Sequence, residues 1–161
     1  MSEKARLRKY EDDLNVSGTG VVVLGAWSII RVFIEVFLGA KSSISFDDES
    51  PAFRVIAMIV VIAIMALISF IVMKIHLYIG LNAMRAAKGR EHKKGYFVAA
   101  VIILILSVLS LITYGDSFQD LENIDTTIAS IIVDLTTIYI FVVVIISTLK
   151  IKELKVPETK G

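Results

Sequence analysis

The chain has 161 residues, of which 56% are hydrophobic, and its mean hydropathy is +0.77. Apolar residues in this proportion, gathered in long blocks, argue against an ordinary soluble domain and are typical of a membrane protein. The net charge of +1 gives no reason to expect nucleic acid as a partner, and the absence of cysteine excludes disulfides, thiolate metal sites and a cysteine nucleophile.

The N-terminal segment, residues 1–15, is rich in charge but carries Leu7, Tyr10 and Leu14 at helical spacing. Such a segment forms either a short amphipathic helix at the membrane surface or a charged tail. Asn15 or Ser17 could cap the helix that follows. The next apolar run is too long, and too interrupted by charge, for a cleavable signal peptide, so we expect it to be retained as a membrane span.

Four membrane spans are predicted, at about residues 16–40, 55–74, 95–115 and 126–149. Each has the length of about 20 residues with which a helix crosses about 30 Å of hydrocarbon. A backbone in lipid must satisfy its own hydrogen bonds, which makes each span an α-helix. We expect the second helix to continue beyond Lys74 to about Ala87 and to end at Gly89. The whole chain, residues 1–161, is thus predicted to be one all-α membrane domain.

Lysine and arginine predict the orientation of these spans. Most of the 17 basic residues lie in the N-terminal segment, between the second and third spans, or in the C-terminal tail from residue 150. Lys41 and Arg54 lie on the opposite side, and Arg31 lies within the first span. The positive-inside rule therefore predicts a plasma-membrane protein with both termini in the cytoplasm. Short connections predict an antiparallel, up-down-up-down four-helix bundle.

Charged and hydroxyl side chains within the spans form the candidate site. Arg31 and Glu35 are four residues apart on the first span, so they share a helix face and can pair. Asp134 lies in the outer half of the fourth span, at a similar depth. A charge at that depth is costly, faces protein or a water-filled cavity, and normally marks function. The predicted polar cluster consists of Arg31, Glu35, Ser107, Ser110, Ser130, Asp134 and Thr137.

Helical periodicity supports an outward-opening pocket between the first, third and fourth spans. Ser130 and Thr137 share the face of Asp134, whereas Tyr139 points roughly 140° away from it. The second span is purely apolar over residues 55–67, so we expect this part to face lipid or another subunit.

Three roles remain open for the polar cluster. One cation facing two carboxylates leaves an excess negative charge, so either a carboxylate holds a proton or a cation or basic partner occupies the site. The cluster would then bind an ion, solute or lipid, or dock another protein's helix. Alternatively, it only fixes the register and pairing of the helices, with its hydroxyl groups bonded back to their own backbone.

Two further sets of residues are weaker candidates. His76 and His92 have no third ligand at metal-binding spacing, and we expect both to be solvated at the cytoplasmic interface. The basic segment between the second and third spans is first of all a topology determinant. It is also a candidate for contact with anionic lipid, through Arg85, Lys88, Arg90, Lys93 and Lys94.

No pattern predicts an enzyme or a cofactor. An aspartyl protease needs two intramembrane aspartates, a serine nucleophile needs a base at its own depth, and no glycine-rich phosphate-binding loop is present. The sequence favours an oligomeric channel-type or transport-type protein in which the cluster tunes ion or proton access. The alternative is an accessory or inhibitor protein that docks another protein's membrane helix. Its expected partners are the lipid bilayer and either further copies of itself or another membrane protein.

Overall fold

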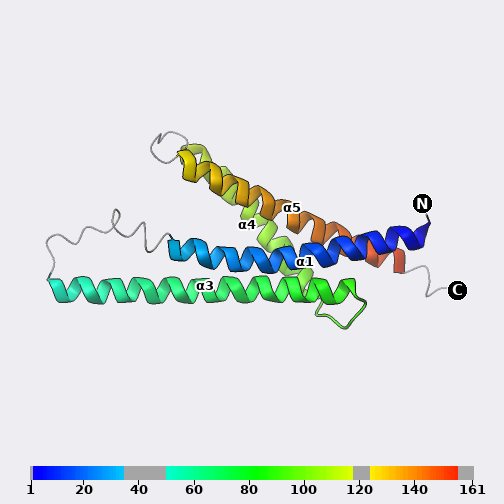
Figure 1. Cartoon of the computed structure of the whole chain (residues 1–161), viewed down its shortest axis with the longest axis horizontal. Helices are drawn as coiled ribbons and strands as arrows, with labels where there is room; N and C mark the ends of the chain where they lie inside the picture. Colours follow the sequence, from blue (N-terminus) through cyan, green and yellow to red (C-terminus); the bar gives the residue numbers. More distant parts are fainter. Residues whose placement is uncertain (1, 35–49, 118–123, 156–161) are drawn as a thin grey trace.

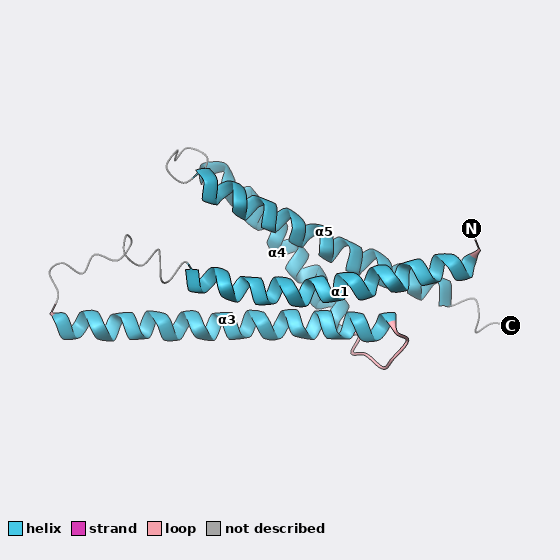
Figure 2. Cartoon of the chain, viewed as in Figure 1, coloured by secondary structure: helices cyan, strands magenta, loops and turns pink. Residues whose placement is uncertain are grey.

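The computed structural model describes residues 2–34, 50–117 and 124–155, and in these ranges every regular element is an α-helix (Figure 1; Figure 2). The helices are α1 (Glu3–Ile34), α3 (Pro51–Ala87), α4 (Gly95–Ser117) and α5 (Ile124–Lys155). Each contains a stretch that is long and apolar enough to cross a membrane. The prediction of an all-helical chain with four such helices is confirmed.

Helix α1 begins earlier than the sequence predicts. It runs without a break from Glu3, so the charged N-terminal segment is the first part of α1 rather than a separate surface helix or a tail. Asn15 and Ser17 accordingly lie inside the helix and do not cap it. The physical reason is tertiary, because Leu14 is fully buried and Ser17 nearly so, and this packing holds the charged turns in the helix.

Helix α3 ends at the position that the sequence indicates. Gly89 has a φ of +64°, a conformation that glycine adopts without steric cost. The backbone N–H of Gly89 donates to the carbonyl of Ala86 (3.1 Å), and that of Arg90 donates to the carbonyl of Arg85 (2.9 Å). These two bonds form a Schellman motif, which satisfies carbonyl groups in the last turn of α3.

The loop from α3 to α4 is held by a buried side chain. Asn82 is 5% exposed, and its Nδ2 donates to the carbonyl of Tyr78 (2.7 Å). The Oδ1 of Asn82 accepts a hydrogen bond from the backbone N–H of Lys93 (2.9 Å), eleven residues further along the chain. One side chain therefore ties the end of the loop to the last turns of α3.

Helices α1 and α3 form the most extensive helix–helix contact, and they approach most closely at two glycines. A Cβ atom on Gly80 would lie 2.5 Å from the carbonyl oxygen of Gly18 and 2.6 Å from Cγ2 of Val22. A Cβ on Gly18 would lie 3.0 Å from the carbonyl oxygen of Gly80. Small residues allow this approach of two backbones, which supplies much of the attraction between helices in lipid.

The helices form two pairs, α1 with α3 and α4 with α5, which diverge from the end of the molecule where α5 ends (Figure 1). Helix α1 also packs against α5, and the best-buried side chains gather near that end. This core includes Leu14, Val21, Ile79, Ala83, Tyr96, Ala100, Phe141 and Val144. Nearly all side chains of residues 55–67 on α3 are exposed, as expected for a surface that faces lipid or another subunit.

The glycine contact predicts opposite effects for two matched substitutions. Both Gly80→Ala and Gly20→Ala raise intrinsic helix propensity by about 1 kcal/mol. At Gly80 the new methyl group meets backbone, and overpacking of this kind costs about 1–3 kcal/mol. At Gly20 it meets only the end of the Ile140 side chain, at 3.1 Å. Thermal unfolding in one detergent should therefore show a lower Tm for Gly80→Ala and an unchanged or higher Tm for Gly20→Ala. An unchanged Tm for Gly80→Ala would show that this contact does not limit packing.

Candidate functional site

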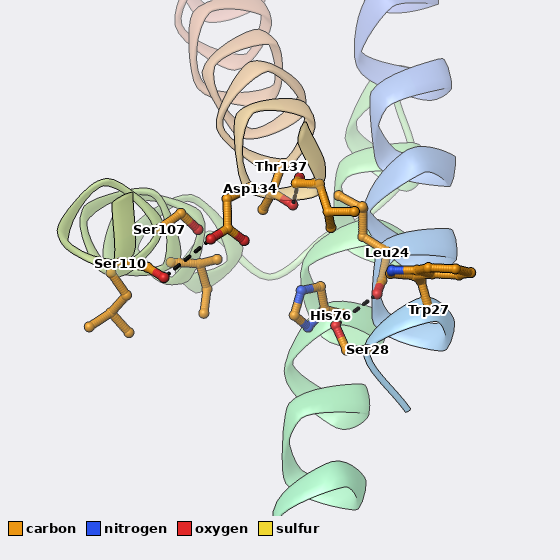
Figure 3. A pocket seen from close by; sticks show the side chains of 11 residues that line it. Leu24, Trp27, Ser28, His76, Ser107, Ser110, Asp134 and Thr137 are labelled. Atoms are coloured by element: carbon orange, nitrogen blue, oxygen red, sulfur yellow. Dashed lines mark hydrogen bonds between the residues drawn. The ribbon is translucent and has the colours of Figure 1, made fainter. Parts of the chain in front are cut away.

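A cavity of about 260 Å³ lies between the α1–α3 pair and the α4–α5 pair, and all four helices line it (Figure 3). We call it the polar cavity, because serine, threonine, histidine and aspartate contribute to its wall. Its lining residues are Leu24, Trp27, Ser28, His76, Ile103, Leu106, Ser107, Ser110, Val133, Asp134 and Thr137.

The carboxylate of Asp134 is the central acidic group of the polar cavity. The hydroxyl of Ser110 on α4 donates a hydrogen bond to Oδ2 of Asp134 on α5, at 3.2 Å (Figure 3). Ser107 precedes Ser110 by one helical turn and lines the same wall. The structure therefore brings together the polar faces of the third and fourth spans at one depth. This contact also joins α4 to α5.

Two other hydroxyl groups of the polar cavity bond to their own helices. Thr137 Oγ1 donates to the carbonyl of Val133 (2.8 Å), and Ser28 Oγ donates to the carbonyl of Leu24 (2.9 Å). Hydrogen bonds of this kind, from a hydroxyl group to the backbone of its own helix, are predicted if the polar cluster has only a structural role. Each hydroxyl oxygen keeps acceptor capacity, so both groups can still take a hydrogen bond from water or present an oxygen to a cation.

His76 corrects an expectation, because it is buried in the wall of the polar cavity and not solvated at an interface. Its side chain is 7% exposed, and its ring lies edge-on to Phe141, with 6.1 Å between ring centroids. Room for the histidine comes from Gly25 on α1, where a Cβ would lie 2.6 Å from Cβ of His76. Helix α3 continues far beyond Lys74, so the side chain meets the neighbouring helices rather than solvent.

The hydrogen bond of His76 identifies its protonated nitrogen. Nδ1 lies 2.9 Å from the carbonyl oxygen of Val72, and a carbonyl can only accept, so Nδ1 carries hydrogen. In the neutral ring, Nε2 is then the acceptor nitrogen. The wall of the polar cavity thus holds two ionisable side chains, His76 and Asp134.

Sequence reasoning missed His76, although one signal was present. His76 shares a helical face with Ile79, Ala83 and Ala86, at spacings of three, four and three residues. All of these residues are buried. The face on which the histidine lies, rather than its distance from the charge at Lys74, predicts its burial.

Part of the predicted polar cluster lies beyond what the structure describes. Arg31 is in α1 and Ser130 is in α5, but their side chains are not described, and Glu35 lies outside the described residues. Pairing of Arg31 with Glu35 or with Asp134 therefore stays a prediction. Tyr139 is 69% exposed, consistent with its predicted direction away from Asp134.

The residues predicted to contact anionic lipid separate into two groups. Arg90 and Lys94 line a second cavity, beside the loop between α3 and α4. Arg85, Lys88 and Lys93 are exposed and do not line it.

The hydrogen bonds described in the polar cavity differ from those of a serine hydrolase. The sequence indicates no base at the depth of the serines, whereas in the structure His76 lines the same cavity as Ser107 and Ser110. In a catalytic triad, however, the serine bonds to the histidine and the carboxylate orients the histidine. Here Ser110 donates to Asp134, and Nδ1 of His76 donates to the carbonyl of Val72. Within the described ranges, no group of three or more histidine, aspartate or glutamate side chains is placed to hold a metal ion.

Comparisons with protein families, curated proteins and solved structures give no match to this chain. Its chemistry is therefore derived from its own residues.

The polar lining predicts that water enters the cavity when the protein is in a membrane. The chain has no cysteine, so a single introduced thiol can be labelled alone. Ser107→Cys places a thiol on the cavity wall, and Ile105→Cys places one on the outer surface of α4, where Ile105 is 54% exposed. The thiolate that reacts forms in water and not in hydrocarbon. A small charged methanethiosulfonate reagent should therefore modify Ser107→Cys in membranes much faster than Ile105→Cys. Equal rates for the two variants would count against a wet cavity.

Proposed function

We propose that this chain is a non-enzymatic, multi-pass protein of the plasma membrane that passes protons or small cations by way of the polar cavity. In this proposal the four helices cross the bilayer in up-down-up-down order, with both termini in the cytoplasm. The basic residues near both termini and between α3 and α4 support this orientation.

The observation that carries the proposal is the presence of a carboxylate and a buried histidine in the lining of one cavity. Asp134 and His76 come from different helices and line the same space, with the hydroxyl groups of Ser107, Ser110 and Thr137 beside them. Ionisable groups inside membrane-spanning helices are costly, and they characteristically serve ion pathways and proton relays. Hydroxyl and carboxylate oxygens also suit hard cations.

The size of the polar cavity favours a very small substrate. Pockets for drug-sized ligands have volumes of about 300–1,000 Å³. The polar cavity has a volume of about 260 Å³, which is room for several water molecules and an ion rather than a metabolite. Three of the helices around it contribute hydroxyl groups to its lining.

Conduction through this protein would require either an oligomer or a rearrangement of the helices. The buried core includes Val21, Ile79, Ala100, Phe141 and Val144, which are all fully buried. On its helix, each of these residues follows the lining of the polar cavity toward the end of the molecule where α5 ends. A packed apolar core of this kind blocks a hydrated ion. The exposed apolar surface of α3 offers a face on which further copies can assemble.

Asp134→Asn tests the proposal, because it removes the charge with little change in shape. A hydrogen bond to a charged group contributes about 1.5–3 kcal/mol, so we expect flux to fall by about tenfold or more. Proton flux into reconstituted liposomes would be followed with a trapped pH-sensitive dye, and alkali-cation flux in parallel. Tyr139→Phe, on the exposed face of the same helix, is the matched control. Unchanged flux in a normally assembled Asp134→Asn protein, or no flux of either kind in the wild type, would contradict the proposal.

A second candidate function is an accessory or inhibitor protein that docks a membrane helix of another protein. The observation that favours it is the divergence of the two helix pairs, which leaves the polar cavity between them (Figure 1). A partner helix with a basic side chain could enter this space and pair with Asp134.

Native mass spectrometry of the protein released gently from its own membrane separates these two functions. A symmetric homo-oligomer is the expected result, because a pathway lined by several copies avoids the packed apolar core of one chain. A stable complex with a different chain would instead support the accessory role. In that case, Asp134→Lys should abolish recovery of the partner, since like charges repel.

A further inference from the structure

A second cavity, of about 620 Å³, lies at the end of the bundle where α4 begins and α5 ends. Its volume falls within the range of about 300–1,000 Å³ that is typical of ligand pockets. Its floor is apolar and includes Leu14, Tyr96 and Ile151, which are at most 8% exposed. We call it the basic cavity, because lysine and arginine surround its opening.

The charged residues that line the basic cavity are all basic. Arg90, Lys94, Lys152 and Lys155 line it, and none of its lining residues is acidic. Lys155 already forms an ion pair with Glu11 (2.9 Å). Among the described residues, no carboxylate lies within ion-pair distance of Arg90, Lys94 or Lys152. Three cations therefore line one partly apolar space with no acidic partner in the described part of the chain.

The segment that carries two of these cations has a fixed backbone. In the Schellman motif, the backbone N–H of Arg90 is hydrogen-bonded to the carbonyl of Arg85. The backbone N–H of Lys93, the neighbour of Lys94, is hydrogen-bonded to the side chain of Asn82. His92 lies between Arg90 and Lys94 in the chain, and its Nδ1 donates to the carbonyl of Arg90 (3.1 Å). Fixing the backbone in this way lowers the entropic cost of binding an anion.

We propose that the basic cavity binds an anionic phospholipid, with the headgroup phosphate held by Arg90, Lys94 and Lys152. The acyl chain would lie along Phe97 and Leu149, which also line the cavity. Arginine and lysine are the side chains that bind phosphate best, and basic pockets between membrane helices bind anionic headgroups. This inference rests on the membrane placement of the helices and is independent of transport through the polar cavity.

The cavity also revises the set of lipid-binding residues that the sequence predicts. Arg90 and Lys94 remain in the set, and Lys152 joins them from the far end of the chain. The other three predicted residues, Arg85, Lys88 and Lys93, do not line the cavity. Three basic residues that line the cavity can therefore be compared with three basic residues that lie outside it.

Two triple variants test this proposal. Arg90→Gln/Lys94→Gln/Lys152→Gln removes three charges from the cavity, and Arg85→Gln/Lys88→Gln/Lys93→Gln removes three from the neighbouring surface. Binding of phosphatidylglycerol to the purified full chain would be measured by native mass spectrometry, and circular dichroism would verify the fold. The first variant should bind about tenfold more weakly or worse, and the second should bind like the wild type.

Two competitors identify the class of ligand. Phosphatidylcholine should displace phosphatidylglycerol poorly, because its headgroup has no net negative charge. Millimolar inorganic phosphate should also displace it poorly, because it lacks the acyl chain that contacts the apolar floor. Equal weakening in both triple variants, no preference over phosphatidylcholine, or full displacement by inorganic phosphate would each overturn the proposal. For a site variant that fails to fold, Lys152→Gln alone, with Lys150→Gln as its control, provides the same comparison.

Discussion

The contact between Gly18 and Gly80 controls the relative position of α1 and α3, and both cavities depend on it. Lipid tails are as apolar as leucine, so helices in a bilayer gain little from hiding apolar side chains and depend on close packing instead. Two facing glycines allow that packing. About two helical turns further along α1, Gly25 leaves the space that His76 fills. The same close approach therefore joins the helices and brings a histidine into the wall of the polar cavity.

The packed core separates two sites of different chemistry. The polar cavity holds a carboxylate, a histidine and several hydroxyl groups, whereas the basic cavity has cations around an apolar floor. Phe141 and Val144 on α5 lie between them along the helix, and both are fully buried. Each site thus has its own surroundings, one within the predicted hydrocarbon region and one near its boundary. This arrangement suits a protein in which ion passage and lipid contact are separate functions.

Hydrogen bonding explains why the polar side chains can be accommodated in an apolar bundle. A buried polar group without a partner costs free energy, and the cost is greatest where water is scarce. The hydroxyl groups of Thr137, Ser28 and Ser69 donate hydrogen bonds to backbone carbonyl groups of their own helices. The hydroxyl group of Ser110 donates a hydrogen bond to the side chain of Asp134. At the other end, Thr148 donates to the carbonyl of Val144 (2.7 Å), so the hydroxyl of Tyr96 must donate to Thr148 (2.9 Å). Ser110 and Tyr96 thus join helices through their hydroxyl groups, whereas Thr137, Ser28 and Ser69 are satisfied within their own helices.

The sequence by itself determines the four apolar helices, the end of α3 at Gly89 and the shared depth of Ser110 and Asp134. These properties depend on local length, turn chemistry and helical periodicity, which can be read along one chain. Only the tertiary structure places His76 and Asp134 in the lining of one cavity, extends α1 back to Glu3, and adds Lys152 to Arg90 and Lys94. Each of these depends on which helix faces which, and that is decided by side chains missing at Gly18, Gly25 and Gly80. A missing side chain acts only through its neighbour on another helix, and the neighbour is unknown until the helices are packed.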